Sequence, residues 1–316
     1  MATAAGLGRA IKGLSEAVFR ERFGTEEACR TALFEMRWRE GLICPACGHK
    51  SFCRLTTRAL FQCNRCKRQV RLTAGTVFQD TKLPLTVWFA AIYHLTQSKN
   101  GISSIELGRR LGVKRQTAWL MKHKLMRAMA AREAQKPKLK GRVEIDDAYL
   151  GGERPGGKRG RGAAGKQPFV AAVETTPERR PKRLKLSVVK GFRKREVEKL
   201  AKCHLAPGTN VVSDGLSCWP AVEKAGCSHR PIATGSGKRA ARWTPFRWVN
   251  TTLGNIKTAL AGTYHHVSAK HAQAYLTSFA YRFNRRRQLD SIVERLAWAA
   301  AHTSPQPYRL IITADA

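Results

Sequence analysis

The stretch VEIDDAYL (residues 143–150) decides how the second half of this chain folds. Its residues form a run rich in β-strand formers, which predicts a β-strand. Further runs follow it in the order strand, strand, helix, strand and helix: FVAAVE (169–174), RLKLSVVKG (183–191), REVEKLAKCHL (195–205), TNVVSDG (209–215) and CWPAVEKAG (218–226). This order predicts a mixed α/β sheet with helices packed against it.

Two acidic residues lie in or at the end of strands of this predicted sheet. Asp146 lies within the first strand, and Asp214 closes the fourth. Metal ions that cleave and join phosphodiesters are held by carboxylates, one ion activating the attacking oxygen and the other the leaving oxygen. Carboxylates are scarce in this chain, so their position favours a metal site over a solvated strand edge or a simple turn, which remain the alternatives. Alternation along the strand places Asp147 on the opposite face from Asp146, and we therefore expect it to hold no metal.

The whole chain is strongly basic. Its 316 residues include 58 Lys and Arg against 22 Asp and Glu, a formal net charge of +36, and 43% of them are hydrophobic. The length allows two or three domains. Such a charge favours a polyanionic partner, and nucleic acid fits better than an acidic membrane because basic residues occur throughout and no apolar run is long enough to span a bilayer. The N-terminus lacks the apolar core of an export signal, so we expect a cytoplasmic, nucleoid-associated protein.

Upstream of the predicted sheet, four of the nine cysteines form two Cys-x-x-Cys pairs. The pairs, fifteen residues apart, are Cys44 with Cys47 and Cys63 with Cys66. Two such pairs supply the tetrahedral thiolate set of a zinc ribbon, and four thiolates leave no open position for a substrate. We therefore expect a structural Zn²⁺ that stabilises the fold without taking part in chemistry. The alternatives are four buried cysteines without metal, or a ligand set that includes His49 or Cys53.

Between the cysteines and the sheet, the sequence predicts a helix-turn-helix. Residues 83–98 carry an apolar stripe at helical spacing; Ser103 caps a short helix that ends at Leu111, and a turn at Gly112 leads to a helix over residues 114–130. A second helix that opens with basic and amide side chains suits the major groove of double-stranded DNA. The side chains expected to point outward and contact DNA are Lys114, Arg115, Gln116 and Lys122. The alternative is a helical packing unit with a solvated charged face.

Five stretches of the chain carry a family resemblance. They are TAGTVFQDTKLPLTVWF (73–89), VEIDDAYLGG (143–152), VVSDG (211–215), WVNTTLGNIKTALAGTYHHVSAKH (248–271) and YRFNRR (281–286). In this order they resemble the ISXO-like group of DDE-type insertion-sequence transposases, which carry an N-terminal zinc ribbon. The resemblance implies an RNase H-like sheet domain with Asp146 as first and Asp214 as second catalytic acid. Asp147 stands where the family usually has Glu, and Ala148 replaces a common Thr.

The third acid of that family is the main departure. The segment where it belongs, residues 248–257, contains Asn250 and no carboxylate. Many relatives resemble this sequence there, with Asn followed seven positions on by Lys, here Lys257. Seven residues return a helix to within about 20° of its starting direction, so both side chains share one face. The resemblance implies that Asn250 completes a magnesium site and that Lys257 holds a phosphate. The alternative for Asn250 is a helix N-cap.

Together these expectations describe a transposase of a bacterial insertion sequence. Two Mg²⁺ ions at Asp146, Asp214 and Asn250 would activate water, free a 3′-hydroxyl at the element's end and direct its attack on target DNA. The ribbon and the helix-turn-helix would recognise the element ends, and joining two ends implies at least a homodimer on DNA. The alternative is a DNA-binding protein without catalysis, either a regulator or an inactivated transposase, because Asn250 leaves only two charged ligands.

The expected fold is multidomain, with a small zinc ribbon and an all-α helix-turn-helix before the α/β RNase H-like domain. The expected segments are an N-terminal helical segment (1–40), the zinc ribbon (41–75), the helix-turn-helix (80–132), the catalytic domain (140–295) and a C-terminal tail (296–316). Within a basic, glycine-rich stretch (151–166), the segment GRGAAGK (160–166) resembles a phosphate-binding loop, but Gln167 replaces the required Ser or Thr. We therefore exclude nucleotide hydrolysis and expect a loop that touches DNA phosphates or is merely solvated.

Overall fold

The structure is a computed structural model that describes residues 13–58, 60–151, 166–232, 244–264 and 267–313. Contact density divides the chain into two compact units. The first, here the N-terminal unit, runs to Arg132 and also includes Arg285–Thr313; the second, the sheet unit, is Glu133–Asn284. The finer division into five segments stays a prediction. The glycine-rich loop expected to touch DNA lies almost wholly outside the described residues.

The N-terminal unit is helical apart from one small antiparallel sheet of strand order β1-β2-β3. Its strands are β1 (Phe52–Leu55), β2 (Leu60–Cys63) and β3 (Gln69–Arg71), with a 3-10 turn η1 (Thr56–Arg58). Its helices are α1 (Glu16–Phe23), α2 (Glu26–Arg37), α3 (Leu85–Gln97), α4 (Ser104–Leu111), α5 (Arg115–Ala134), α10 (Ile292–Ala301) and α11 (Tyr308–Ile312). The first two helices begin after side-chain caps, because Ser15 and Thr25 each accept a first-turn N–H.

The predicted cap and turn of the helix-turn-helix are confirmed. Ser103 Oγ accepts the N–H of Glu106 at 3.1 Å and starts α4. Gly112 ends that helix with φ 66°, a left-handed conformation that glycine adopts without steric cost. The next helix, α5, begins at Arg115. Among the described helices, none is long and apolar enough to cross a membrane.

The sheet unit holds one five-stranded sheet of order β6-β5-β4-β7-β8. Its strands are β4 (Arg142–Leu150), β5 (Gln167–Thr175), β6 (Pro181–Val188), β7 (Asn210–Ser213) and β8 (Ser228–Pro231). The pairs β6–β5 and β5–β4 are antiparallel, whereas β4–β7 and β7–β8 are parallel. This mixed sheet after a zinc ribbon and a helical region confirms the predicted fold class. The last strand was not anticipated, and the final predicted helix is a 3-10 helix, η2 (Trp219–Ala225).

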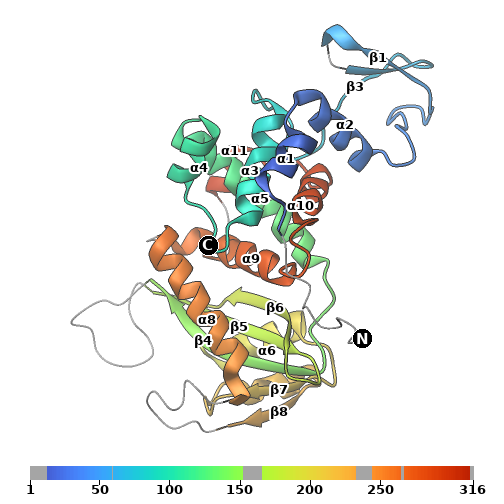
Figure 1. Ribbon diagram of the computed structural model, residues 1–316. Helices are drawn as coiled ribbons and strands as arrows, with labels where there is room; N and C mark the ends of the chain where they lie inside the picture. The colour runs from blue at the N-terminus through green and yellow to red at the C-terminus, as the bar shows by residue number, and fades with distance from the viewer. Residues whose placement is uncertain (1–12, 59, 152–165, 233–243, 265–266, 314–316) are drawn as a thin grey trace, which may run out of the picture. The chain divides into compact units, whose positions relative to one another are not determined.

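Helices cover both faces of this sheet. They are α6 (Lys194–His204), η3 (Thr244–Phe246), α8 (Arg247–Ala259), the π-helical turn η4 (Leu260–Tyr264) and α9 (Ala269–Asn284). Val143 and Ile145 of β4 enter the core formed with α6 and η2. Ala148 and Leu150 enter the opposite core, formed with α8 and α9. Figure 1 shows α8 running in front of the sheet strands. Because side chains alternate along a strand, Asp146 belongs to the α8 face and Asp147 to the α6 face.

Candidate functional site

Three carboxylates come together just beyond the point where β4 and β7 stop pairing. Asp146, Asp147 and Asp214 are half-buried, and one oxygen of each lies within 4.8 Å of the others. The parallel pairing of β4 with β7 reaches only to Glu144 and Val212. The two strands therefore carry their acids into a region where no ladder hydrogen bonds fill the space between them. Neighbouring parallel strands that end in this way are a common location for ligand sites.

That Asp147 holds no metal stays a prediction, although its carboxylate lies beside the other two. The alternation itself is as expected, because Tyr149 packs against Phe192 on the α6 face, with ring centroids 5.3 Å apart. However, Asp146 Oδ1 turns back along the strand and accepts the N–H of Asp147 at 2.8 Å. Alternation fixes the direction of each Cβ but not the reach of a carboxylate beside an unpaired strand edge. Asp147 is thus the third carboxylate of the cluster.

Asp214 is held by groups from the turn that follows β7. Its Oδ1 accepts the indole N–H of Trp219 at 2.6 Å and the backbone N–H of Leu216 at 3.2 Å. The ring of Trp219 is fully buried in the α6-side core, so this donor is fixed in position. On the preceding residue, Ser213 Oγ donates to the Asp214 carbonyl and contacts His229 Nε2, both at 2.8 Å. The sequence analysis did not identify Trp219 as a partner of Asp214. A Trp five residues after a candidate ligand was the available signal, because a buried indole N–H needs a hydrogen-bond partner.

The chemistry of this cluster suits a hard divalent cation. Two charges about 4 Å apart repel by roughly 4 kcal/mol at an effective dielectric constant of about 20. A divalent cation between the three carboxylates, which lie within 4.8 Å of one another, would offset this repulsion. An all-oxygen donor set is what Mg²⁺ prefers. The residues present fit a magnesium site, and the donor set would not suit a soft metal.

The helix α8 carries the other two predicted catalytic residues. It begins at Arg247 after Phe246, so Asn250 lies inside the helix, and the alternative that Asn250 is an N-cap is wrong. Val249 packs into the core that α8 shares with Ala148, on the face of β4 to which Asp146 belongs. Asn250 is half-buried, whereas Lys257 is exposed. The contribution of Asn250 and Lys257 to catalysis stays a prediction.

The four cysteines of the two Cys-x-x-Cys pairs form a second cluster, in the N-terminal unit. Cys44 Sγ lies 3.5 Å from Cys66 Sγ, and Cys47 Sγ lies 3.7 Å from Cys63 Sγ. A tetrahedral zinc with Zn–S bonds of about 2.3 Å places its sulfurs about 3.8 Å apart, so the cluster has the geometry of a structural zinc site. Among the described residues this cluster includes neither His49 nor Cys53. Cys53 is exposed, and its thiol points to the Gln62 carbonyl.

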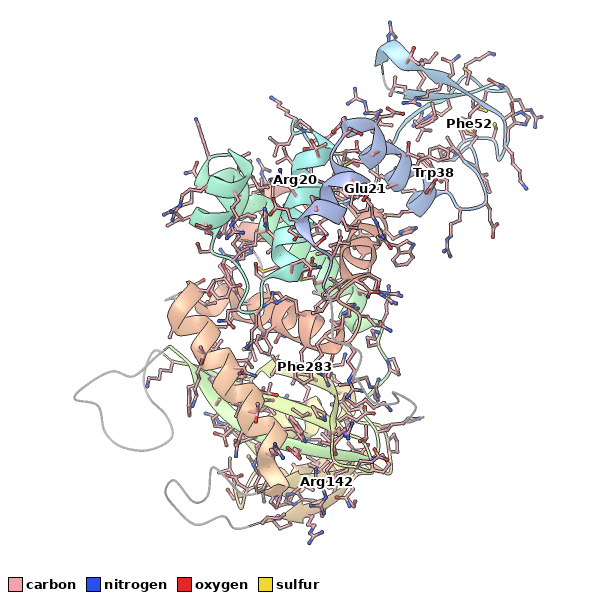
Figure 2. The ribbon with its side chains drawn as sticks, in the orientation of Figure 1. Arg20, Glu21, Trp38, Phe52, Arg142 and Phe283 are labelled. Carbon is pink, nitrogen blue, oxygen red and sulfur yellow. The ribbon has the colours of Figure 1, made fainter. Side chains whose placement is uncertain are left out.

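The strands beside this cluster pack on α2 through aromatic rings. Phe61 of β2 lies 5.2 Å from Phe34 and 5.6 Å from Trp38, measured between ring centroids (Trp38 is labelled in Figure 2). Arg54 of β1 donates to both carboxylate oxygens of Glu27, at 2.9 and 3.1 Å. The cysteine cluster is therefore built into the N-terminal unit through its own sheet.

The side chains predicted to contact DNA divide into two groups. Lys114, Arg115 and Gln116 are exposed at the start of α5, as expected. The prediction that Lys122 points outward is wrong, because Lys122 is only 1% exposed and its amine donates to the Ile102 carbonyl at 3.0 Å. The helical period placed Lys122 in the direction of Arg115, but α5 is exposed only in its first turn and again near its end, at Ala131 and Ala134. Further along, α5 is buried on several sides, which a period derived from one stripe does not reveal.

A mixed sheet of this order, with clustered carboxylates on β4 and directly after the neighbouring strand β7, is consistent with an RNase H-like domain of the DDE type. The profile of the ISXO2-like transposase domain matches residues 138–284, within the sheet unit. The profile of the transposase zinc-ribbon domain matches residues 24–69. The chain therefore contains an ISXO2-like (IS1595) DDE transposase domain, preceded by a transposase zinc ribbon.

A curated relative agrees with this assignment. The chain is 33% identical, over 148 residues, to the "Uncharacterized protein in transposable element ISH50" of Halobacterium salinarum. The match covers 44% of this chain and 49% of the relative, so it spans about half the length of that protein.

Proposed function

We propose that the protein binds the ends of a bacterial insertion sequence and catalyses magnesium-dependent DNA strand cleavage and strand transfer. The observation that carries this proposal is the cluster of Asp146, Asp147 and Asp214 on the central strands of an RNase H-like sheet. Membership of the ISXO2-like family supports the same reaction class.

We assign the magnesium site to Asp146, Asp214 and Asn250, with Asp147 as a further carboxylate. When bound, two Mg²⁺ ions supply activation of the attacking oxygen and neutralisation of the leaving oxygen in an in-line displacement. The protein's own part is to hold the ligands in place. The indole of Trp219 fixes one oxygen of Asp214, which sets the orientation of that carboxylate before a metal arrives. Lys257, exposed on α8, is assigned to a DNA phosphate.

We assign DNA recognition to the N-terminal unit. Lys114, Arg115 and Gln116 open α5 as exposed donors, which suits contacts with double-stranded DNA in the major groove. A structural Zn²⁺ at the four cysteines would hold the ribbon together, and its four thiolates exclude a catalytic role for that metal. The formal charge of +36 suits both element ends and target DNA as partners and supports a location at the nucleoid. Joining two ends requires at least a homodimer in the DNA complex.

The test is cleavage of DNA that carries the cognate element ends. We expect nicking with Mg²⁺ or Mn²⁺ and none with EDTA. Asp146→Ala and Asp214→Ala should abolish cutting and retain end binding, because neither residue belongs to the N-terminal unit. If the wild-type protein binds the ends but never cuts them with either metal, the enzymatic proposal is wrong and the non-catalytic alternative is favoured.

A further inference from the structure

The helix α8 lacks a cap from its own sequence. Phe246 occupies the cap position and makes no side-chain hydrogen bond to the first turn. Instead, Glu144 Oε2 accepts the N–H groups of Trp248 at 2.9 Å and Val249 at 3.1 Å. A carboxylate from a strand more than a hundred residues away therefore satisfies two of the amides that a helix start leaves unpaired.

The second oxygen of the same carboxylate is held by Arg142. Arg142 Nη1 donates to Glu144 Oε1 at 2.7 Å and to Thr175 Oγ1 at 3.3 Å. Its Nη2 donates to the carbonyl of Pro245, directly before α8, at 2.8 Å (Arg142 is labelled in Figure 2). Arg142 and Glu144 therefore bind the backbone on both sides of the start of α8, at the Pro245 carbonyl and at the first-turn amides.

This pair lies on the strand that carries the acids. Glu144 precedes Asp146 by two residues and lies on the same face of β4. Val249, whose N–H is bonded to Glu144, is followed directly by Asn250. The two predicted metal ligands are therefore connected through Glu144. Glu144 lies two residues before Asp146 on β4, and its carboxylate accepts the N–H of Val249, the residue before Asn250 in α8.

Stability alone is a weak reason to bury this carboxylate. Glu144 is 1% exposed, and a buried ion pair often contributes no more stability than apolar residues of similar volume. The best-attested use of such a pair is to specify one arrangement of the elements that it joins. A carboxylate at a helix N-terminus also interacts favourably with the helix dipole, which fixes the helix end on which it acts.

We propose that Glu144, held by Arg142, is a positioning residue that sets the place and rotation of α8, and with it the Asn250 amide, relative to Asp146. This inference rests on the proposed function, in which Asn250 is a metal ligand. Glu144 acts through Asn250 and touches neither metal nor DNA.

Glu174 provides a matched control. It is also 1% exposed, lies on the neighbouring strand β5 and is paired with Lys182 and Arg183, at 3.1 and 2.5 Å. Among the described residues, its carboxylate is bonded to Lys140, Lys182 and Arg183, none of which lies in α8. Glu174→Gln therefore removes an equally buried charge from the same sheet and leaves the helix start intact.

The experiment compares Glu144→Gln, Glu174→Gln, Asn250→Ala and the double variant of Glu144 and Asn250 in the full-length protein. Amide hydrogen exchange over α8 reads the helix start, and Mn²⁺ binding followed by electron paramagnetic resonance reads the metal site without DNA. Glu144→Gln should speed exchange at the first turn of α8 and weaken Mn²⁺ binding about tenfold, as loss of an outer-shell partner commonly does. Glu174→Gln should change neither. In the Asn250→Ala background, Glu144→Gln should cause no further loss.

Four results would overturn the proposal. They are normal exchange at the start of α8 in Glu144→Gln, equal loss of Mn²⁺ affinity in Glu174→Gln, unchanged Mn²⁺ affinity in Asn250→Ala, and additive losses in the double variant. If Glu144→Gln does not fold, Arg142→Lys keeps the charge but not both guanidinium contacts. Arg142→Lys should then show faster exchange at the start of α8 and weaker Mn²⁺ binding, both to a smaller extent than expected for Glu144→Gln. If neither quantity changes in Arg142→Lys, the proposal is also overturned. A wild-type protein that binds Mn²⁺ but never cuts DNA would refute the proposed activity. The Mn²⁺ affinities of the single and double variants could still be compared in that case.

Discussion

Trp219 offers the sharpest test of how the acids are held. Its indole N–H donates to Asp214 Oδ1 at 2.6 Å, and its ring is fully buried. Trp219→Phe removes the donor and part of the ring, and the smaller aromatic residue still occupies most of the volume. Asp214 Oδ1 then still accepts the backbone N–H of Leu216, at 3.2 Å.

The expected size of the effect follows from the type of hydrogen bond that is lost. A hydrogen bond to a charged group contributes about 1.5 to 3 kcal/mol, and about 1.4 kcal/mol corresponds to a factor of ten in an equilibrium constant. Part of that energy is recovered when the carboxylate rotates to other donors. We therefore expect the Mg²⁺ concentration for half-maximal cleavage to rise about tenfold. Cleavage at saturating Mg²⁺ should fall much less, since the ligand itself remains.

Trp88→Phe is the matched control for this measurement. Its indole N–H donates to Thr81 Oγ1 at 2.8 Å, and the side chain is almost as deeply buried, but it lies in the N-terminal unit. Both variants should lower the melting temperature, because each removes buried ring volume and a hydrogen bond. Only Trp219→Phe should shift the Mg²⁺ titration. An unchanged Mg²⁺ titration in Trp219→Phe, or an equal shift in both variants, would refute the reasoning.

Three further predictions concern other parts of the chain. Cys63→Ser should release the zinc, measured as metal content per chain, and weaken end binding without unfolding the sheet unit; retention of the metal would contradict the four-thiolate site. Arg115→Ala should reduce the slope of log affinity against log salt concentration by about one, whereas Lys122→Met should leave the slope unchanged because that amine is buried; equal slopes for the two variants would contradict this assignment. Burial, and then nearby lysines, lower the pKa of His204 to about 4, so the folded state binds fewer protons than the unfolded state below pH ~6.5. Stability should therefore be intact above that pH and fall by up to about 3 kcal/mol as the pH drops towards 4; denaturant titrations of wild type and His204→Gln should differ in this slope.

The predictions that succeeded were those that depend on neighbours in the sequence. The two Cys-x-x-Cys pairs cluster because each pair is a single tight turn. Ser103 caps α4, and Gly112 ends it, because both roles depend on backbone groups within one helical turn. The alternation along β4 also holds, since the pleat of a strand is a local property.

The predictions that failed concern contacts between distant segments. Lys122 is buried because the carbonyl of Ile102 and the surrounding helices enclose it. The position of the Asp147 carboxylate beside the other acids was also not anticipated; it arises where pairing between β4 and β7 ends, at Glu144. Asn250 is not a cap, since α8 starts three residues before it with a cap supplied from another strand.

The sequence by itself therefore determined the class of this protein. It showed a zinc ribbon, a basic helical region and a mixed sheet with Asp146 and Asp214, because ligand spacing, helix caps and strand alternation are short-range properties. Only the tertiary structure decided that Asp147 joins the acids and that Trp219 and Glu144 hold the elements around them. Those outcomes depend on where two strands stop pairing and on which buried group satisfies which donor, and no short-range pattern contains that information.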